Sequence, residues 1–229
     1  GVVNRSLSDA FGQLYVEKYF PPANKERMEQ LVKNLQIALG ERIDAQEWMS
    51  PATKAAAHEK LDAFYVKIGY PDKWRDYSKM DIDPAKSLYE NMKEVSKWLQ
   101  ADIVSRRWKK PVDPTEWHMT PQTVNAYYNP TTNEICFPAG ILQYPFFDME
   151  ADDAFNYGAI GVVIGHEMSH GFDDQGRQFD KDGNFRDWWA EGDADKYNER
   201  AQVIKDFFSA IKVLPDLNAN GDLCCGENL

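Results

Sequence analysis

Several features that mark common classes of protein are scarce in this chain of 229 residues. Its three cysteines, Cys136, Cys224 and Cys225, include an adjacent pair, and such an odd set excludes a disulfide framework. No run of about 20 apolar residues occurs, so we expect no membrane-spanning segment. The formal net charge of −11 argues against nucleic-acid binding, because that affinity comes largely from Lys and Arg. No internal repeat or low-complexity stretch is visible.

The chain does contain enough apolar material for a sizeable core, since 43% of its residues are hydrophobic and 13% are aromatic. We expect a single domain, or part of a larger one. Apolar residues recur at helical spacing in two stripes, which predicts helices packed on a core. The stripes are Leu61, Phe64, Tyr65 and Ile68, and Leu88, Met92, Val95, Leu99 and Ile103.

Local start and stop signals predict the helix boundaries. Ser50 is a capping residue, Pro51 follows it at the first helical position, and Gly69 ends the helix that they begin. We expect further helices over residues 24–40, 83–107, 155–170 and 187–208.

Residues 123–128 and 134–137 are β-prone and flank a turn, which predicts a hairpin. An exposed strand edge can take an extended peptide as one more strand. Asn125 and Ala126 are therefore placed to hydrogen-bond a substrate main chain. An ordinary hairpin with a capping asparagine is the alternative.

The most informative segment is His166-Glu167-Met168-Ser169-His170, in which two histidines stand four residues apart. On a helix, Cβ atoms at this spacing lie about 5–6 Å apart, which lets both imidazoles bind one zinc ion. Glu167 can hold a water at the open coordination position and accept its proton. The motif predicts a zinc-dependent peptide hydrolase.

A catalytic zinc takes three protein ligands and keeps one open position. The residues after His170 lack the third histidine of a metzincin, so that class is excluded. A glutamate from a second helix remains as the third ligand. Glu191, Glu199 and Glu227 are candidates, and spacing favours Glu191 without deciding the choice.

Four motifs follow one another along the chain. They are Val124-Asn125-Ala126-Tyr127-Tyr128, Phe137-Pro138-Ala139-Gly140-Ile141-Leu142, Gly165 to Phe172 with Asp173-Asp174, and Gly226-Glu227-Asn228. Together they resemble the neprilysin and endothelin-converting-enzyme family of zinc metallopeptidases, and the similarity runs over nearly the whole chain. The resemblance implies a thermolysin-like zincin catalytic domain of the α+β class, mostly helical with a small β-sheet, and one Zn²⁺ per chain.

The resemblance also implies roles for single residues. It places the third zinc ligand at Glu227, beside His166 and His170. Glu167 takes the proton of the attacking water and passes it to the departing amine. Asp173 is a plausible partner for a ligand histidine, with capping of the helix end as its alternative role.

Substrate binding is implied in the same way. Peptides would bind along Asn125 and Ala126, as the hairpin edge suggests. The family binds an apolar side chain just after the cleaved bond, and its pocket corresponds here to Ile141, Phe146 and Val163. We therefore expect cleavage on the N-terminal side of hydrophobic residues.

The family pattern extends beyond this sequence at both ends, so we expect a truncated fragment whose activity alone is open. An aspartate one helical turn after Glu227, a later His and Arg, and the helical half that closes over the substrate are absent. The expected partners are peptides and the remainder of the parent protein, namely its C-terminal part and helical lid domain. We expect one fragment over 1–229, mainly helical over 1–120, with the hairpin region over 121–150 and zinc-binding helices over 151–229.

Cysteine usage bears on the metal and on the compartment. Cys224 and Cys225 stand close to Glu227, where they could bind zinc as thiolates or pack at a helix entrance. The cysteine-rich pattern of the vertebrate ectoenzymes is missing, so the chain is similar to bacterial-type members. An extracytoplasmic location, in the periplasm or cell envelope, is favoured over the cytoplasm.

Calcium is a rival metal, because residues 216–227 match the spacing of an EF-hand loop. Against calcium, Pro215 interrupts the incoming helix and only Asp216 and Glu227 are carboxylates among the usual ligands. A turn that delivers a zinc ligand, or a plain turn at Asn220-Gly221, also fits. The alternative function is a non-catalytic metal-binding module, with structural zinc or EF-hand-like calcium.

Overall fold

The computed structural model describes residues 1–228 and is mostly helical with two small sheets. The α-helices are α1 (Val2–Ser6), α2 (Ser8–Tyr19), α3 (Pro22–Asp44), α4 (Pro51–Asp62), α5 (Leu88–Arg107), α6 (Asp153–Gly158), α7 (Ile160–Ser169), α8 (Asp193–Ser209) and α9 (Cys225–Asn228), with a 3₁₀ turn η1 (Gly176–Gln178). The strands are β1 (Tyr65–Gly69), β2 (Tyr127–Asn129), β3 (Glu134–Pro138), β4 (Lys212–Leu214) and β5 (Leu217–Asn218). These elements confirm the predicted α+β, mostly helical class. Within residues 1–228 no helix has both the length and the apolar character needed to cross a membrane.

β3 is the central strand of the main sheet, whose order is β1-β3-β2. β1 pairs with it in parallel and β2 antiparallel. Ile135 and Phe137 of β3 are fully buried and share one core with Ile160, Ile164 and Met168 of α7. Burial of each such side chain contributes about 1.5–3 kcal/mol, so this core fixes α7 against the sheet.

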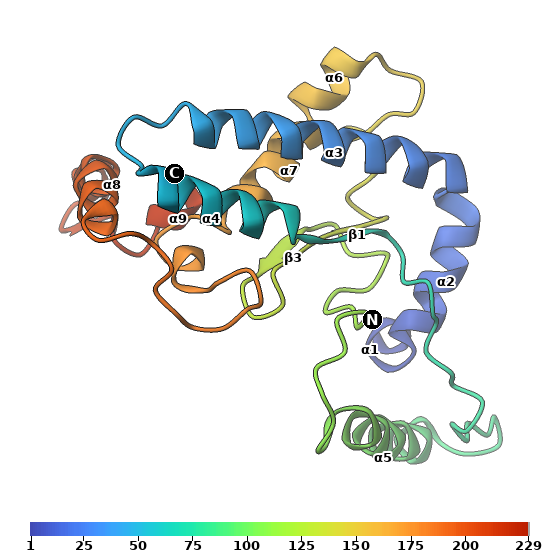
Figure 1. Cartoon of the computed structure of the whole chain (residues 1–229). Coiled ribbons are helices and arrows are strands. Elements are labelled where there is room, and N and C mark those ends of the chain that lie inside the picture. The colour runs from blue at the N-terminus through green and yellow to red at the C-terminus, as the bar shows by residue number, and fades with distance from the viewer. Residues whose placement is uncertain (229) are drawn as a thin grey trace.

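α3 spans 23 residues and lies across the other helices. Pro22 opens it, because the fixed φ of proline suits the first helical position. Its buried face includes Met28, Leu31 and Val32, and it packs against both α4 and α7. Figure 1 shows α3 running above α4 and the sheet, with α5 and α1 in a lower part of the molecule.

The helix predicted from Ser50 ends earlier than expected, and the last residues of the predicted helix form a strand. α4 stops at Asp62, and Tyr65 to Gly69 form β1 instead. The segment is rich in β-branched and aromatic residues, which fit a pleated surface, and all five of its residues pair with β3. Helical spacing of the apolar residues was therefore misleading here.

The apolar stripe of α5 does not pack on the main core as predicted. Val95 is buried, whereas Leu88 is 66% exposed and Ile103 is 40% exposed. The predicted helix is present but begins at Leu88 rather than at residue 83, because Ser87 and Glu90 form a capping box there. α5 contacts α1, and that short helix covers only a small part of its surface.

The predicted helix over 155–170 is two helices. Ala159, with φ −107° and ψ −90°, has a non-helical conformation and separates α6 from α7. The N–H of Ile160 donates to the carbonyl of Phe146 at 2.8 Å instead of continuing the helical pattern. The helix predicted over 187–208 begins only at Asp193, because Gly192 has a left-handed φ of 82°.

The predicted hairpin is present as β2 and β3. Tyr127 pairs with Cys136 and Asn129 with Glu134. Residues 123–126 lie outside the ladder, because the chain turns where the N–H of Thr123 bonds the carbonyl of Thr120. Asn125 and Ala126 therefore lie immediately before the edge strand rather than within it.

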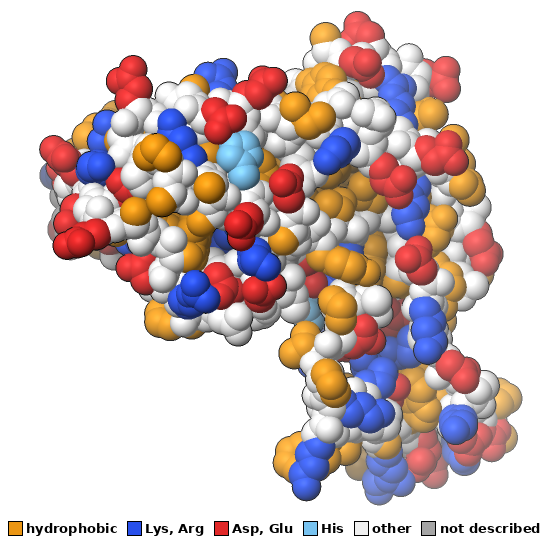
Figure 2. All heavy atoms as spheres, viewed as in Figure 1, with side chains coloured by type: hydrophobic (Ala, Val, Ile, Leu, Met, Phe, Trp, Pro, Cys, Tyr) orange, Lys and Arg blue, Asp and Glu red, His pale blue; other side chains and the backbone are white. Residues whose placement is uncertain are grey.

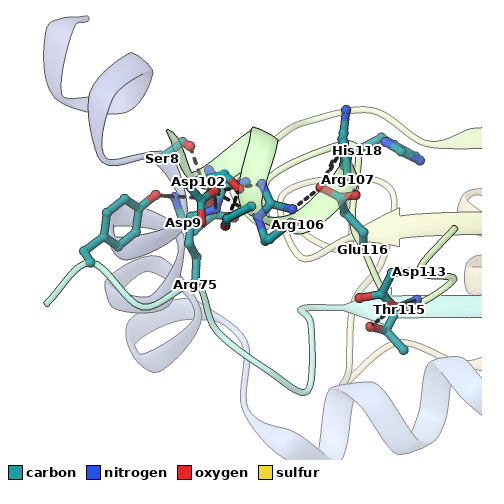
Figure 3. Close-up of polar contacts among 12 residues, drawn as sticks. Ser8, Asp9, Arg75, Asp102, Arg106, Arg107, Asp113, Thr115, Glu116 and His118 are labelled. Atoms are coloured by element: carbon teal, nitrogen blue, oxygen red, sulfur yellow. Dashed lines mark hydrogen bonds and ion pairs between the residues drawn. The ribbon is translucent and has the colours of Figure 1, made fainter. Parts of the chain in front are cut away.

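A network of ion pairs, which we call the α5 joint, ties α5 to the sheet. The carboxylate of Glu116 binds Arg106 and Arg107 in the last turn of α5. The main-chain carbonyl of Glu116 accepts from Nζ of Lys67, in β1, at 2.7 Å. Further members, drawn in Figure 3, are Asp9, Arg75 and Asp102.

Candidate active site

Two histidines of α7 and a glutamate of α9 converge at one point. Nε2 of His166 and Nε2 of His170 are 3.0 Å apart. The carboxylate of Glu227 approaches with Oε2 at 3.3 Å from Nε2 of His166 and Oε1 at 3.9 Å from Nε2 of His170. Within residues 1–228 these three residues make up the one group of His, Cys, Asp or Glu side chains close enough to share a metal ion.

The donor atoms fit a tetrahedral zinc ion. With zinc–nitrogen and zinc–oxygen distances of about 2.0–2.1 Å, two tetrahedral ligand atoms lie about 3.4 Å apart. The three separations between these atoms, 3.0, 3.3 and 3.9 Å, bracket that value. Two imidazole nitrogens and one carboxylate oxygen are also the donors that zinc favours.

Asp173 orients the second histidine. Its Oδ2 accepts a hydrogen bond from Nδ1 of His170 at 2.7 Å, which leaves Nε2 free to face Glu227. Oδ1 of Asp173 accepts from the N–H groups of Gln175 at 2.9 Å and Gly176 at 2.6 Å. The hydrogen bond to Asp173 raises the pKa of His170, although burial opposes this.

Glu167 lies on the same helix and is 7% exposed. Burial raises the pKa of its carboxyl to about 7, His170 opposes the rise, and Glu227 adds to it. A base whose pKa lies near neutral pH accepts and releases protons efficiently at that pH. A cavity of about 680 Å³ opens beside His170 and Glu227.

The residues predicted to bind substrate differ in their exposure. Asn125 is exposed, whereas Ala126 next to it is buried. Ile141 is 5% exposed and belongs to the main core, while Phe146 is 36% exposed and lies near the start of α7. Val163 stands one helical turn before Glu167.

The competing ligand assignments find no support in the geometry. Glu191 and Glu199 are exposed and stand outside the metal-binding group found in residues 1–228. Sγ of Cys224 lies 3.8 Å from the carbonyl of Gly221, and Cys225 is buried beside Tyr197.

The EF-hand arrangement is also absent from the described residues. Asn218, the third residue of that loop, lies in β5 and donates to the carbonyl of Ser209 at 2.9 Å. Asp216 stands in the exposed turn between β4 and β5. Glu227, the last residue of the loop, faces the histidines instead. Its carboxylate is therefore not available to a calcium ion in this loop.

Two contacts of the site could not be read from the sequence pattern. Gly226 packs against Asp173, because a Cβ built at Gly226 would stand 2.6 Å from Oδ2 of that carboxylate. Lys60 of α4 is 1% exposed and binds the segment after α7. Both contacts join residues far apart in the chain, so no local spacing could reveal them.

Comparison with known proteins gives a consistent result along the chain. Residues 1–71 and residues 125–229 each match a model described as peptidase family M13. Neprilysin-1 of Caenorhabditis elegans is 43% identical over 231 residues, covering 97% of this chain and 30% of the relative. Neutral endopeptidase of Lactobacillus helveticus is 38% identical over 229 residues, covering 100% of this chain and 35% of the relative.

Solved structures share this fold. A Mycobacterium tuberculosis zinc metalloprotease, Zmp1 in complex with an inhibitor, has a TM-score of 0.89 and 46% identity, over 98% of this chain and 34% of that one. PepO from Lactobacillus rhamnosis has a TM-score of 0.91 and 33% identity, over 100% of this chain and 36% of that one. The chain spans about a third of the length of the curated relatives it matches. The family models match both the N-terminal and the C-terminal part of the chain, and the similar solved structures cover nearly all of it. The chain therefore belongs to peptidase family M13, the neprilysin family of zinc metallopeptidases.

Proposed function

We propose that this protein is a zinc-dependent endopeptidase that binds one zinc ion per chain through His166, His170 and Glu227. The observation that carries the proposal is the convergence of these side chains at separations that suit tetrahedral zinc. When bound, zinc polarises a substrate carbonyl and lowers the pKa of water.

The chain's own residues perform the proton transfers. Glu167 is placed to accept a proton from the attacking water, and its raised pKa near 7 suits both that step and donation to the departing amine. Asp173 holds His170 in the tautomer whose Nε2 lone pair is free to bind the metal.

Substrate recognition follows from the sheet. β2 is an edge strand, and Asn125 and Ala126 lie directly before it, so an extended peptide can hydrogen-bond their main chain. Ile141, Phe146 and Val163 are proposed to receive an apolar side chain after the cleaved bond. Peptides with hydrophobic residues at that position are therefore the proposed substrates.

Substitution Glu167→Gln tests the proton-transfer role. The amide keeps the shape of the side chain but accepts no proton, so we expect zinc to remain bound while peptide turnover falls about 10²–10⁴-fold. Metal analysis and a quenched fluorescent peptide assay measure the two quantities. Glu191→Gln, at an exposed position outside the site, is the control. Retained turnover in E167Q would refute the role of Glu167.

Cleavage mapping tests the proposed specificity. A peptide library digested with the protein and analysed by mass spectrometry should yield products that begin with Leu, Ile or Phe. Replacing that residue by Asp in one substrate should slow its cleavage, because a charged group loses hydration in an apolar pocket. Products that begin equally often with charged residues would contradict the proposed pocket.

A further inference from the structure

Lys60 is buried next to the site but belongs to none of its chemistry. It lies in the last turn of α4 and is 1% exposed. Its Nζ donates to three main-chain carbonyls, those of Gly171 at 2.7 Å, Gly176 at 2.7 Å and Phe179 at 2.6 Å. An ammonium group has three N–H donors, so every donor of the charged side chain has an acceptor.

The three carbonyls belong to the segment that follows α7. Gly171 stands at the C-terminal end of this helix, where the helix dipole favours a cation. Gly176 and Phe179 belong to the turn around η1. Lys60 therefore holds both ends of residues 171–179, the loop that carries Asp173.

Asp173 connects this loop to the metal site. The carboxylate reaches His170 through Oδ2 while Oδ1 is held by the N–H groups of Gln175 and Gly176. Any shift of the loop must move the carboxylate relative to the imidazole. Burial lowers the pKa of Lys60 to about 7, and Asp173 and Asp180 oppose that change.

The position of Lys60 is itself fixed by the sheet. Asn133, in the turn between β2 and β3, donates from Nδ2 to the main-chain carbonyl of Lys60 at 3.0 Å. The rings of Tyr128, Phe172 and Trp188 lie 5.6 to 5.8 Å from Nζ and shield it from water. We propose that Lys60 is a positioning residue for the zinc ligand His170, acting through the 171–179 loop and Asp173.

This inference rests on the proposed zinc site, and the matched control is the other buried lysine nearby, Lys67. Lys67 is 3% exposed, is paired with Glu134 at 2.7 Å, and lies in β1 outside the metal-binding group. Lys60→Met and Lys67→Met each remove one buried ammonium. Both substitutions should lower the free energy of unfolding measured in urea. Only K60M should weaken zinc binding, by about tenfold, because only that variant loosens the loop that holds the zinc ligand His170. Chelator competition measures the zinc Kd.

A second readout in metal-free protein keeps this inference separate from the proposed function. The Nδ1–H of His170, held by Asp173, should give a downfield imidazole N–H signal in NMR spectra of the wild type and K67M, and lose it in K60M. If K60M does not fold, Lys60→Gln takes its place. An unchanged signal in a folded Lys60 variant, or equal zinc loss in K60M and K67M, would overturn the positioning role. Absence of stoichiometric zinc from the wild type refutes the proposed zinc site, whatever the NMR signal shows.

Discussion

Gly226, in α9, packs against Asp173, the carboxylate that holds the zinc ligand His170. A side chain there meets Oδ2 of Asp173, and that carboxylate cannot swing away freely because three hydrogen bonds hold it. The requirement for glycine here is one of space, since the Gly226 backbone lies against a fixed carboxylate. Glu227 can approach the histidines only if its neighbour stays this small.

Gly226→Ala should therefore weaken zinc binding by about tenfold, because it displaces either Asp173 or the helix that carries Glu227. Chelator competition at neutral pH is the measurement. Gly158→Ala is the control, because a Cβ at Gly158 meets no atom within 4 Å. Unchanged zinc affinity in G226A would show that α9 adapts without disturbing the site.

At the scale of elements, Asp193 joins α8 to α4. Its Oδ2 accepts from the N–H of Ser50 at 2.9 Å and from the hydroxyl of Thr53 at 2.7 Å, the cap and first turn of α4. Burial alone would raise the pKa of Asp193, but the hydrogen bonds from Ser50 and Thr53 outweigh it and hold the pKa below the usual 3.8. The contact fixes where α8 begins, together with Gly192.

Asp193→Ala should lower the free energy of unfolding by about 2–3 kcal/mol near neutral pH, as expected for lost hydrogen bonds to a buried charge. Because the folded-state pKa is depressed, this contribution is present above pH 3.8 and is lost as the pH falls below it. Urea unfolding at neutral and acidic pH measures the difference.

Asp195→Ala, an exposed carboxylate in the same helical turn, is the control and should cost less than about 1 kcal/mol. Equal losses in the two variants would mean that Asp193 acts only on the helix dipole.

At the scale of the whole molecule, the α5 joint links α5 to the sheet, and α5 contacts few other elements. Figure 2 shows acidic and basic side chains intermixed over the lower part of the molecule that carries α5. Burial of Glu116 would raise its pKa, but hydrogen bonds from Arg107 and Arg106 outweigh it and lower the pKa to about 2. Partly exposed pairs of this kind are weakened by salt.

Glu116→Gln should lower the free energy of unfolding by about 1–2 kcal/mol at neutral pH and low salt. The folded-state pKa is depressed, so the stabilisation is present above pH 4.5 and is lost as the pH falls from 4.5 to about 2. Denaturant unfolding over a pH and salt series is the measurement.

Glu94→Gln is the control, because Glu94 forms an exposed pair with Lys97 of the same helix. That variant should leave the free energy of unfolding close to the wild-type value, because water and salt screen an exposed pair. A difference between wild type and E116Q that persists in acid would contradict an ionic role for the joint.

Sequence alone determined the features that depend on local geometry. Four-residue spacing places His166 and His170 on one side of a helix whatever surrounds it, and Ser50 marks a helix start through a bond to its own neighbour Thr53. The order of the four motifs along the chain also indicated the family. Such features hold because each depends on residues a few positions apart.

Tertiary structure decided everything that joins distant segments. Spacing left three glutamates as candidates for the third zinc ligand, and only the fold brings Glu227 to the histidines. Residues 65–69 fit helical spacing, yet β3 pairs with them and makes them a strand. Lys60 lies 111 residues from Gly171 in sequence but 2.7 Å from its carbonyl in space. Contacts of this kind arise from packing of the whole chain, so no local period in the sequence encodes them.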